Sequence, residues 1–201
     1  MSDFFTFAEL GLRHIAGIGA MDHILFLLAL AAIYTFSDWR SIIWVVTAFT
    51  IGHSITLAAA VFGYMPLSQP VVEFLIPLTI VATCIENIIV KDRSRAPMKG
   101  AYRPVFAILF GLVHGAGFGG YLKSLFVDRV AVPLLGFNVG IEVGQIAVLL
   151  AIFALLKAAD MLLRPFTAAS AAAGAVRYRV VGISAAVMLV ATTWALERVP
   201  W

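Results

Sequence analysis

The chain of 201 residues has the composition of an integral membrane protein. Hydrophobic residues make up 62% of it and charged residues 12%, and the mean hydropathy is +1.01, a balance that excludes an ordinary soluble domain. The formal net charge is +3, but the basic residues lie in loops between apolar runs, which argues against a nucleic-acid partner. A single cysteine, Cys84, excludes an internal disulfide and a cysteine-rich metal cage.

Six apolar runs are each long enough to cross a bilayer as a helix. They cover residues 20–37, 42–62, 70–90, 104–122, 132–156 and 179–196. The sequence therefore predicts an all-α membrane protein with six transmembrane helices, which form a single integral membrane domain over residues 1–201. Residues 3–16 mix apolar and charged side chains, which is typical of a short interfacial helix, and no cleaved signal peptide is expected.

The basic residues are divided unevenly between the two sides that this topology defines. The first, third and fifth loops contain Arg40, Lys91, Arg93, Arg95, Lys99, Arg103, Lys157, Arg164, Arg177 and Arg179, whereas the other side contains Arg13, Lys123, Arg129 and Arg198. Because loops rich in Lys and Arg stay in the cytoplasm, we expect a multi-pass protein with both termini outside.

Two histidines and an aspartate lie where the first apolar run begins: His14, Asp22 and His23. On a continuous α-helix, His14 and His23 would be about 13 Å and about half a turn apart, too far to share one metal ion. Gly17 and Gly19 lie between them and favour a helix break, which would fold His14 back toward His23, as in transporters with broken helices. The alternative is that Asp22 caps the helix and the histidines lie among headgroups, but these groups then still need partners.

The later spans also carry polar side chains, several of them on one helix face. They are His53 and Ser54 in the second span, Glu86 and Asn87 in the third, His114 in the fourth, and Asn138, Glu142 and Gln145 in the fifth. Each has a structural alternative: a lone histidine is hydrogen-bonded inside the bundle, and Glu86 pairs with Lys91 or Arg93. Glu142 is harder to explain in this way, because it lies about 15 Å into its helix with no Lys or Arg near mid-membrane.

The stretch around His114 is similar to the stretch around His14. Residues 11–19 and 111–119 are identical at six of nine positions, and three spans separate them. An odd number of spans inverts a repeat in the membrane, so the sequence indicates an inverted three-helix repeat with broken or kinked glycine-rich helices. Glycine and alanine are common in this chain, and chance similarity is the alternative.

The polar set has the chemistry of a transition-metal site. Imidazole and carboxylate groups suit Ni²⁺, Co²⁺, Zn²⁺ or Fe²⁺, and the lack of Cys and Met clusters argues against Cu(I). By depth the set runs from Asp22 outermost to Glu86 innermost, a ladder of weak sites that suits conduction. No organic cofactor is expected. The expected metal ligands are His14, Asp22, His23, His53, Glu86, His114 and Glu142, supported by Ser54, Asn87, Asn138 and Gln145.

Taken together, these motifs resemble the HupE/UreJ family of small bacterial membrane proteins, especially its second, UreJ-like branch. The resemblance implies six spans in the bacterial inner membrane and nickel or cobalt uptake, often as a secondary permease. The opening is also similar to the H-x4-D-H signature of nickel/cobalt permeases, with seven residues between His14 and Asp22. The matching residues are Gly11, His14, Asp22, His23, Thr47, Phe49, Thr50, His53, Ser54, Glu86, Asn87, Phe110, Gly111, Leu112, His114, Gly115, Gly117, Phe118, Phe137, Asn138, Gly140, Glu142, Gly144 and Gln145.

Three functions compete on this basis. The first is a divalent-metal permease, not an enzyme, whose sites are spread in depth along a hydrated path. The second is an intramembrane zinc-dependent hydrolase, which needs ligands that converge on one ion with an open position for water; His53, His114 and Glu142 are candidates, assisted by Ser54. The third is a metal-binding structural or accessory subunit. The expected partners are the lipid bilayer and the divalent metal ion, and a homo-oligomer is left open.

Overall fold

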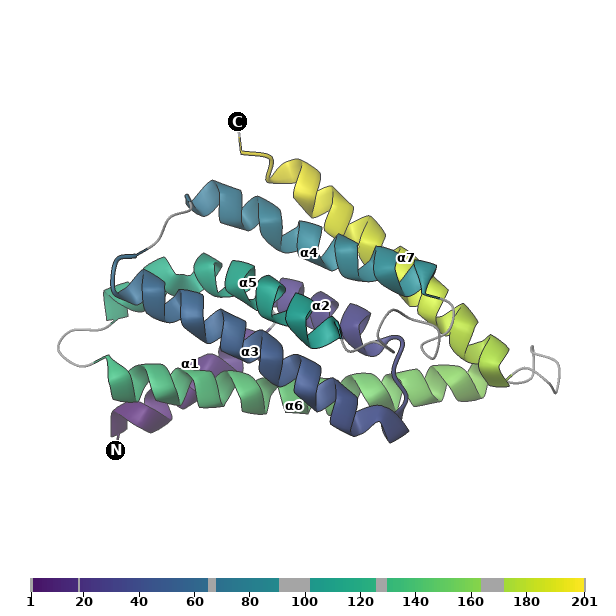
Figure 1. The fold of residues 1–201 in the computed structure, drawn as a ribbon. Coiled ribbons are helices and arrows are strands. Elements are labelled where there is room, and N and C mark those ends of the chain that lie inside the picture. Colours follow the sequence, from purple (N-terminus) through teal and green to yellow (C-terminus); the bar gives the residue numbers. More distant parts are fainter. Residues whose placement is uncertain are drawn as a thin grey trace.

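The computed structural model describes residues 2–17, 19–64, 68–90, 102–125, 130–163 and 172–200, and within these ranges the chain is helical with no strand. Of the basic residues that set the expected orientation, Lys91, Arg93, Arg95, Lys99, Arg129 and Arg164 lie outside the described ranges. The elements, drawn in Figure 1, are α1 (Ser2–Ala16), α2 (Met21–Ala31), a 3-10 turn η1 (Phe36–Asp38), α3 (Trp39–Val61), α4 (Gln69–Ile89), α5 (Arg103–Leu125), α6 (Ala131–Leu163) and α7 (Ala172–Glu197).

Five of these elements are long and apolar enough to cross a membrane on their own, and they agree with the second to sixth predicted spans. α1 and α2 pass the same test only together, and they are bent by 66° where they meet, so they form either a broken sixth crossing or a re-entrant segment. The expected uninterrupted span over residues 20–37 is wrong, because α2 has only 11 residues and is therefore about 16 Å long. The expected interfacial helix over residues 3–16 is instead α1, which packs along α6 and buries Ile15 completely.

The break between α1 and α2 falls at the glycines that predict it. The amide of Gly17 still donates to the carbonyl of Arg13 at 2.9 Å, and Gly17 in turn accepts a bond from the amide of Ala20 at 2.9 Å, which turns the chain out of α1. A Cβ at Gly17 would press on the Arg13 carbonyl oxygen, whereas Gly19 faces open space. The two half-helices are therefore joined by a short turn that only glycine accommodates at residue 17.

Two helix pairs hold the bundle together through backbone contact. In the first pair, α1 lies on α6: a Cβ at Gly11 would collide with the carbonyl of Phe137, and one at Gly140 with the carbonyl of Ala8. In the second pair, α5 lies on α3, where a Cβ at Gly111 would collide with the carbonyl of Phe49. Such close approach is how helices associate in lipid, where burial of apolar surface drives little.

The two pairs correspond to each other in the way an inverted repeat requires. Gly11 of α1 meets α6 between Phe137 and Ile141, and Gly111 of α5 meets α3 between Phe49 and His53. In such a repeat α1 corresponds to α5, α3 to α6 and α4 to α7. Under this correspondence the α1–α6 pair becomes the α5–α3 pair, and the third close pair, α4 with α7, maps onto itself. The halves differ in one respect: the first span is broken between α1 and α2, whereas α5 is continuous through its glycines. Those glycines instead make room for His53, Ala60 and Ile76.

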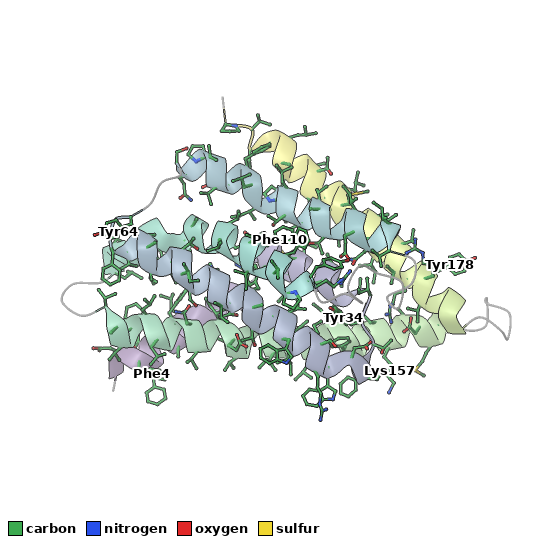
Figure 2. All side chains as sticks on the ribbon, viewed as in Figure 1. Phe4, Tyr34, Tyr64, Phe110, Lys157 and Tyr178 are labelled. Carbon is green, nitrogen blue, oxygen red and sulfur yellow. The ribbon has the colours of Figure 1, made fainter. Side chains whose placement is uncertain are left out.

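Polar and aromatic side chains mark the two ends of the bundle. Figure 2 shows Tyr64 at one end and Tyr178 and Lys157 at the other, whereas Tyr34 lies inside, where it is buried. The end that carries Tyr178 is fastened by Arg179 of α7, which bonds Asp160 of α6 and donates to the carbonyl of Tyr34 at 3.0 Å. These bonds fix the segment that follows α2 and so help to position α2 itself.

We expect Gly140→Ala to lower the stability of the detergent-solubilised protein by about 1–3 kcal/mol, because the added Cβ must push α1 away from α6. The fall in Tm, about 2–4 °C per kcal/mol for a chain of this size, is measurable by thermal unfolding. The matched control is Gly182→Ala on α7, where a Cβ meets nothing. Equal Tm values for the two variants would contradict the packing described for α1 and α6.

Candidate metal centre

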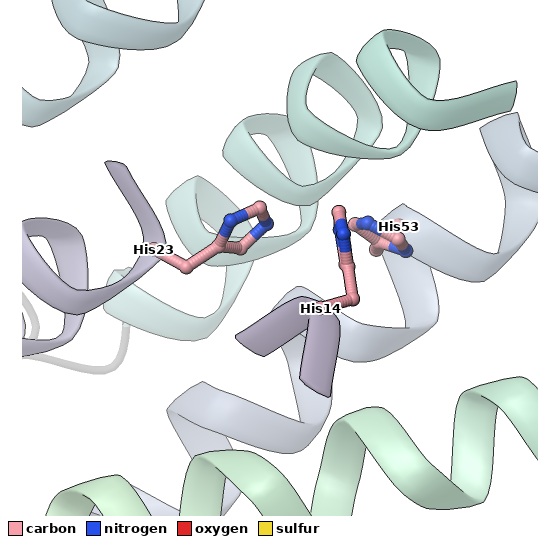
Figure 3. A group of neighbouring side chains, drawn as sticks. All are labelled: His14, His23 and His53. Atoms are coloured by element: carbon pink, nitrogen blue, oxygen red, sulfur yellow. The ribbon is translucent and has the colours of Figure 1, made fainter. Parts of the chain in front are cut away.

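Three histidines from three different helices converge in the interior. His14 lies near the end of α1, His23 in the first turn of α2 and His53 in the middle of α3. One ring nitrogen from each lies within 4.8 Å of those of the others, and Figure 3 shows the three side chains gathered between their helices. The His14 ring centroid is 4.7 Å from that of His23 and 5.9 Å from that of His53. The break in the first span is what brings His14 back to His23.

A fourth histidine, His114 of α5, adjoins this group, with its ring centroid 5.2 Å from that of His23. Its Nε2 is 3.0 Å from the hydroxyl of Thr79 on α4, and that hydroxyl donates its own proton to the carbonyl of Ile76 at 2.7 Å. Thr79 must therefore accept from His114, so Nε2 carries the proton and Nδ1 carries a lone pair. His114 Nδ1 is buried and has no hydrogen-bond partner among the described residues.

Asp22 orients His23 in the same manner. One carboxylate oxygen, Oδ1, accepts from the backbone amide of His23 at 2.8 Å and from its Nδ1 at 3.0 Å. The opposite nitrogen, Nε2, then carries a lone pair, which is the tautomer that binds metal when a carboxylate backs the ring. The sequence predicts Asp22 as a ligand, but in this geometry its described contacts are those of a group that holds His23 in place.

The ring nitrogens of the four histidines are unusual, because several of them are buried and bond to no other described residue. The buried ring nitrogens without a hydrogen-bond partner among the described residues are His14 Nε2, His23 Nε2, His53 Nδ1, His53 Nε2 and His114 Nδ1. Each buried polar atom left in this state costs about 1–3 kcal/mol, so a cluster of five is expensive in an apolar bundle. A cation held by several imidazoles removes this cost, and imidazole is a preferred ligand of Ni²⁺, Co²⁺ and Zn²⁺.

A cavity of about 510 Å³ leads to the cluster from the end of the bundle where α4 begins and α7 ends. Its carboxylates are Asp22 and Glu73, and Glu73 accepts from the side-chain amide of Gln69 at 3.0 Å. The basic side chains at the cavity are Arg13, which bonds Glu9, and Arg198. Its walls are formed by Arg13, His14, Gly19, Ala20, Asp22, His23, Gln69, Glu73, Ile76, His114, Gly117, Phe118 and Arg198.

On the opposite side the cluster is closed by aromatic rings. Phe26 of α2 and Phe49 of α3 are both buried, and their ring centroids lie 5.3 Å and 5.1 Å from that of His114. His53 is completely buried behind His14 and does not line the cavity. The cluster is therefore reached from one end of the bundle and sealed toward the other.

The two glutamates expected in the site lie elsewhere. Glu142 of α6 accepts from the hydroxyl of Thr47 at 2.5 Å, so its partner is a hydroxyl and not a cation. Glu86, at the far end of α4, bonds Tyr102 and Arg103; the pairing with Lys91 or Arg93, the structural alternative that the sequence offers, falls on residues outside the described ranges. The expected ladder in depth is thus wrong for the histidines, which form one cluster.

Two of the supporting polar residues, Gln145 and Asn87, bond across helices, whereas Ser54 bonds within α3. The Gln145 side-chain oxygen accepts from the hydroxyl of Thr50 at 2.8 Å, and Ser54 donates to the Thr50 carbonyl at 2.7 Å. Asn87 donates to the carbonyl of Ala29 at 2.7 Å, while Oδ1 of Asn138 is buried without a hydrogen-bond partner in the described ranges.

Sequence reasoning missed the groups that complete the site. Thr79 belongs to a recognisable polar stripe on α4, but its pairing with His114 depends on how α4 meets α5. Phe118 packs on His14 with ring centroids 4.0 Å apart. A glutamate near the start of a helix is ordinarily a charge that favours the helix dipole, and only the fold places Glu73 at the cavity.

The comparison with protein-family models gives one match, described as "HupE / UreJ protein", over residues 1–198. No curated protein and no solved structure matches the chain. The match extends the resemblance from the motifs of residues 11–145 to almost the whole chain, and it accords with the helical, multi-pass architecture. The chain belongs to the HupE/UreJ family.

Proposed function

We propose that the protein carries a divalent transition-metal ion, nickel or cobalt first, across the bacterial inner membrane, and that the four-histidine cluster is the site that binds the ion during passage. The observation that carries the proposal is the convergence of ring nitrogens from His14, His23 and His53 within 4.8 Å of one another at the end of a cavity, with the His114 ring beside that of His23. Membership of the HupE/UreJ family points to the same two metals, or to a role beside urease.

The chemistry of the ligands suits reversible binding. Neutral imidazoles contribute no charge, so a divalent ion keeps its full charge and remains able to leave, as passage through a membrane requires. Asp22 raises the basicity of His23 from behind without placing a carboxylate on the ion. Because imidazole must be neutral to bind a metal, acidification competes with the ion for the same nitrogens.

The cavity suggests how the ion reaches the cluster. It would enter from the end that carries Glu73 and Asp22, and Phe26 and Phe49 would have to move before it continued. The single cluster thus favours a carrier that opens to one side at a time over a channel with a row of sites. By the distribution of basic residues, the open end is the outer one.

An intramembrane zinc-dependent hydrolase is the second candidate, because three converging histidines beside a cavity are also what a catalytic zinc site needs. The side chains expected to assist it argue the other way. Ser54 donates to the Thr50 carbonyl, Glu142 accepts from Thr47, and neither lines the cavity. Asp22 and Glu73, which do line it, are engaged by His23 and Gln69. We therefore prefer transport.

Metal binding is the first test of the cluster. Titration calorimetry of the purified protein with Ni²⁺, Co²⁺ and Zn²⁺ should give a reversible site at pH 7.5. His23→Ala and His53→Ala should abolish this site. Asp22→Asn should raise Kd by about 10–100-fold, because the carboxylate that accepts from His23 Nδ1 is lost. Glu142→Gln, away from the cluster, is the control with unchanged Kd. Wild-type affinity in both histidine variants would remove the cluster from the proposal.

Transport is tested separately by nickel uptake into liposomes that contain the protein. We expect time-dependent uptake that His114→Ala abolishes and Glu142→Gln retains. One zinc ion that co-purifies tightly, together with no uptake of any divalent metal, would instead favour the hydrolase.

Orientation is tested by cysteine labelling in a Cys84→Ser background, which removes the buried native thiol. Glu197→Cys at the end of α7 should react with a membrane-impermeant maleimide in spheroplasts, because six crossings return the chain to the side where it began. Ser37→Cys should react only after the membrane is permeabilised. The reverse pattern would invert the proposed direction of the cavity.

A further inference from the structure

A second cavity, of about 400 Å³, lies between α4 and α5 at the end of these helices remote from the histidine cavity. Its walls are almost wholly apolar and include Phe26, Leu30, Ile85, Ile89, Phe106 and Phe110. Ile89 is 70% exposed and Phe106 49% exposed, so the cavity borders the lateral surface of the bundle, which lipid covers. It takes no part in the proposed metal site.

Charged and polar groups gather at one end of this cavity only. Glu86, Tyr102 and Arg103 lie there, where α4 ends and α5 begins. From Arg103 to Phe110 is seven residues, about 10 Å along α5, and this length is lined by apolar side chains. The cavity therefore runs from a polar mouth near the membrane boundary to an apolar interior, which is the polarity profile of a phospholipid from phosphate to acyl chain.

Arg103, one of the residues that line the mouth, does not use all of its hydrogen-bond donors within the described part of the chain. It is only 6% exposed, and its Nη2 bonds Glu86 and also Asn87 at 3.3 Å. Its Nη1 is buried without a hydrogen-bond partner in the described part of the chain. A buried guanidinium N–H left unpaired is costly, and phosphate oxygens are its strongest ordinary partners.

The surrounding charges favour an anion. The one described carboxylate in the cavity lining, Glu86, is engaged by Arg103, and Arg177 adds a second cation nearby, where it donates to the carbonyls of Asn87 and Ile88 at 3.0 Å and 2.5 Å. Partial burial and the hydrogen bond to Glu86 raise the pKa of the Tyr102 phenol, so no second anion forms beside Arg103.

We propose that this cavity binds one phospholipid of the adjoining leaflet, with an acyl chain between α4 and α5 and its phosphate on Arg103. A purely apolar occupant would leave Nη1 of Arg103 unpaired. Inorganic phosphate would leave the apolar length of the cavity unfilled. Only an amphiphile with both parts satisfies the whole cavity.

The test is native mass spectrometry of the full-length, delipidated protein titrated with phosphatidylglycerol. The wild type should bind one lipid per chain. Ala82→Trp, at a position that lines the cavity, should weaken binding at least tenfold by filling it. The matched control is Ala154→Trp, at an exposed position of α6 outside the cavity, which should bind as the wild type does. Equal binding by the two tryptophan variants would overturn the proposal.

The phosphate contact is tested by changing either the lipid or the arginine. Uncharged diacylglycerol should bind at least tenfold more weakly than phosphatidylglycerol, and Arg103→Gln should remove that difference, with Arg103→Lys restoring part of it. Because Arg103→Gln leaves Glu86 without its partner, its Tm is measured alongside, and if it does not fold the diacylglycerol comparison in the wild type decides. Equal affinity for the two lipids, or saturable binding of inorganic phosphate alone, would count against the proposal.

Discussion

Close approach of backbones at glycine is the constraint on which the rest of the structure depends. Gly11 and Gly111 let α1 press on α6 and α5 press on α3, and each glycine precedes a histidine of the cluster by three residues. Gly115 lies against the carbonyl of His53. The contacts that hold the bundle together in lipid therefore also set the separations of the rings, so the geometry of the cluster is as rigid as the packing of the two pairs.

A cluster in one place has a different physical meaning from a series of sites. Sites spread along a path let one ion displace the next, whereas a single site must be exposed to each side in turn. The outer approach is an open cavity, and the inner side is sealed by buried aromatic rings. If the protein carries metal as proposed, the described arrangement is the state that faces outward, and the inward state requires helix α2 or α3 to move with its phenylalanine.

Much of this architecture could be predicted from the sequence, because hydrophobic length and glycine placement are local properties. The five later spans and the break at Gly17 follow from these two signals. The first span was misjudged because the apolar pattern continues past Ala31, where the helix ends and the chain turns toward η1. Hydropathy records the preference of residues for lipid and does not record where a helix stops.

The composition of the site was harder to predict, because periodicity identifies the face of a helix but not the neighbour that covers it. Glu142 and His53 both lie on polar faces, yet Glu142 meets Thr47 and His53 meets His14. Glu86 pairs with Arg103, which lies 17 residues further along the chain at the start of α5. Tertiary packing decides which partner each of these side chains contacts, and residue spacing within one helix does not predict it.

Phe26 lies between the histidine cluster and the apolar cavity between α4 and α5. One face of its ring neighbours His114, and the same residue lines the cavity between α4 and α5. A rearrangement of this side chain changes both the histidine cluster and the cavity. Binding of the metal ion and binding of the lipid are therefore thermodynamically linked. By reciprocity, the factor by which an acyl chain changes affinity for the ion equals the factor by which the ion changes affinity for the acyl chain. The thickness and saturation of the surrounding bilayer would then act as an effector of metal handling, without any contact between lipid and ion.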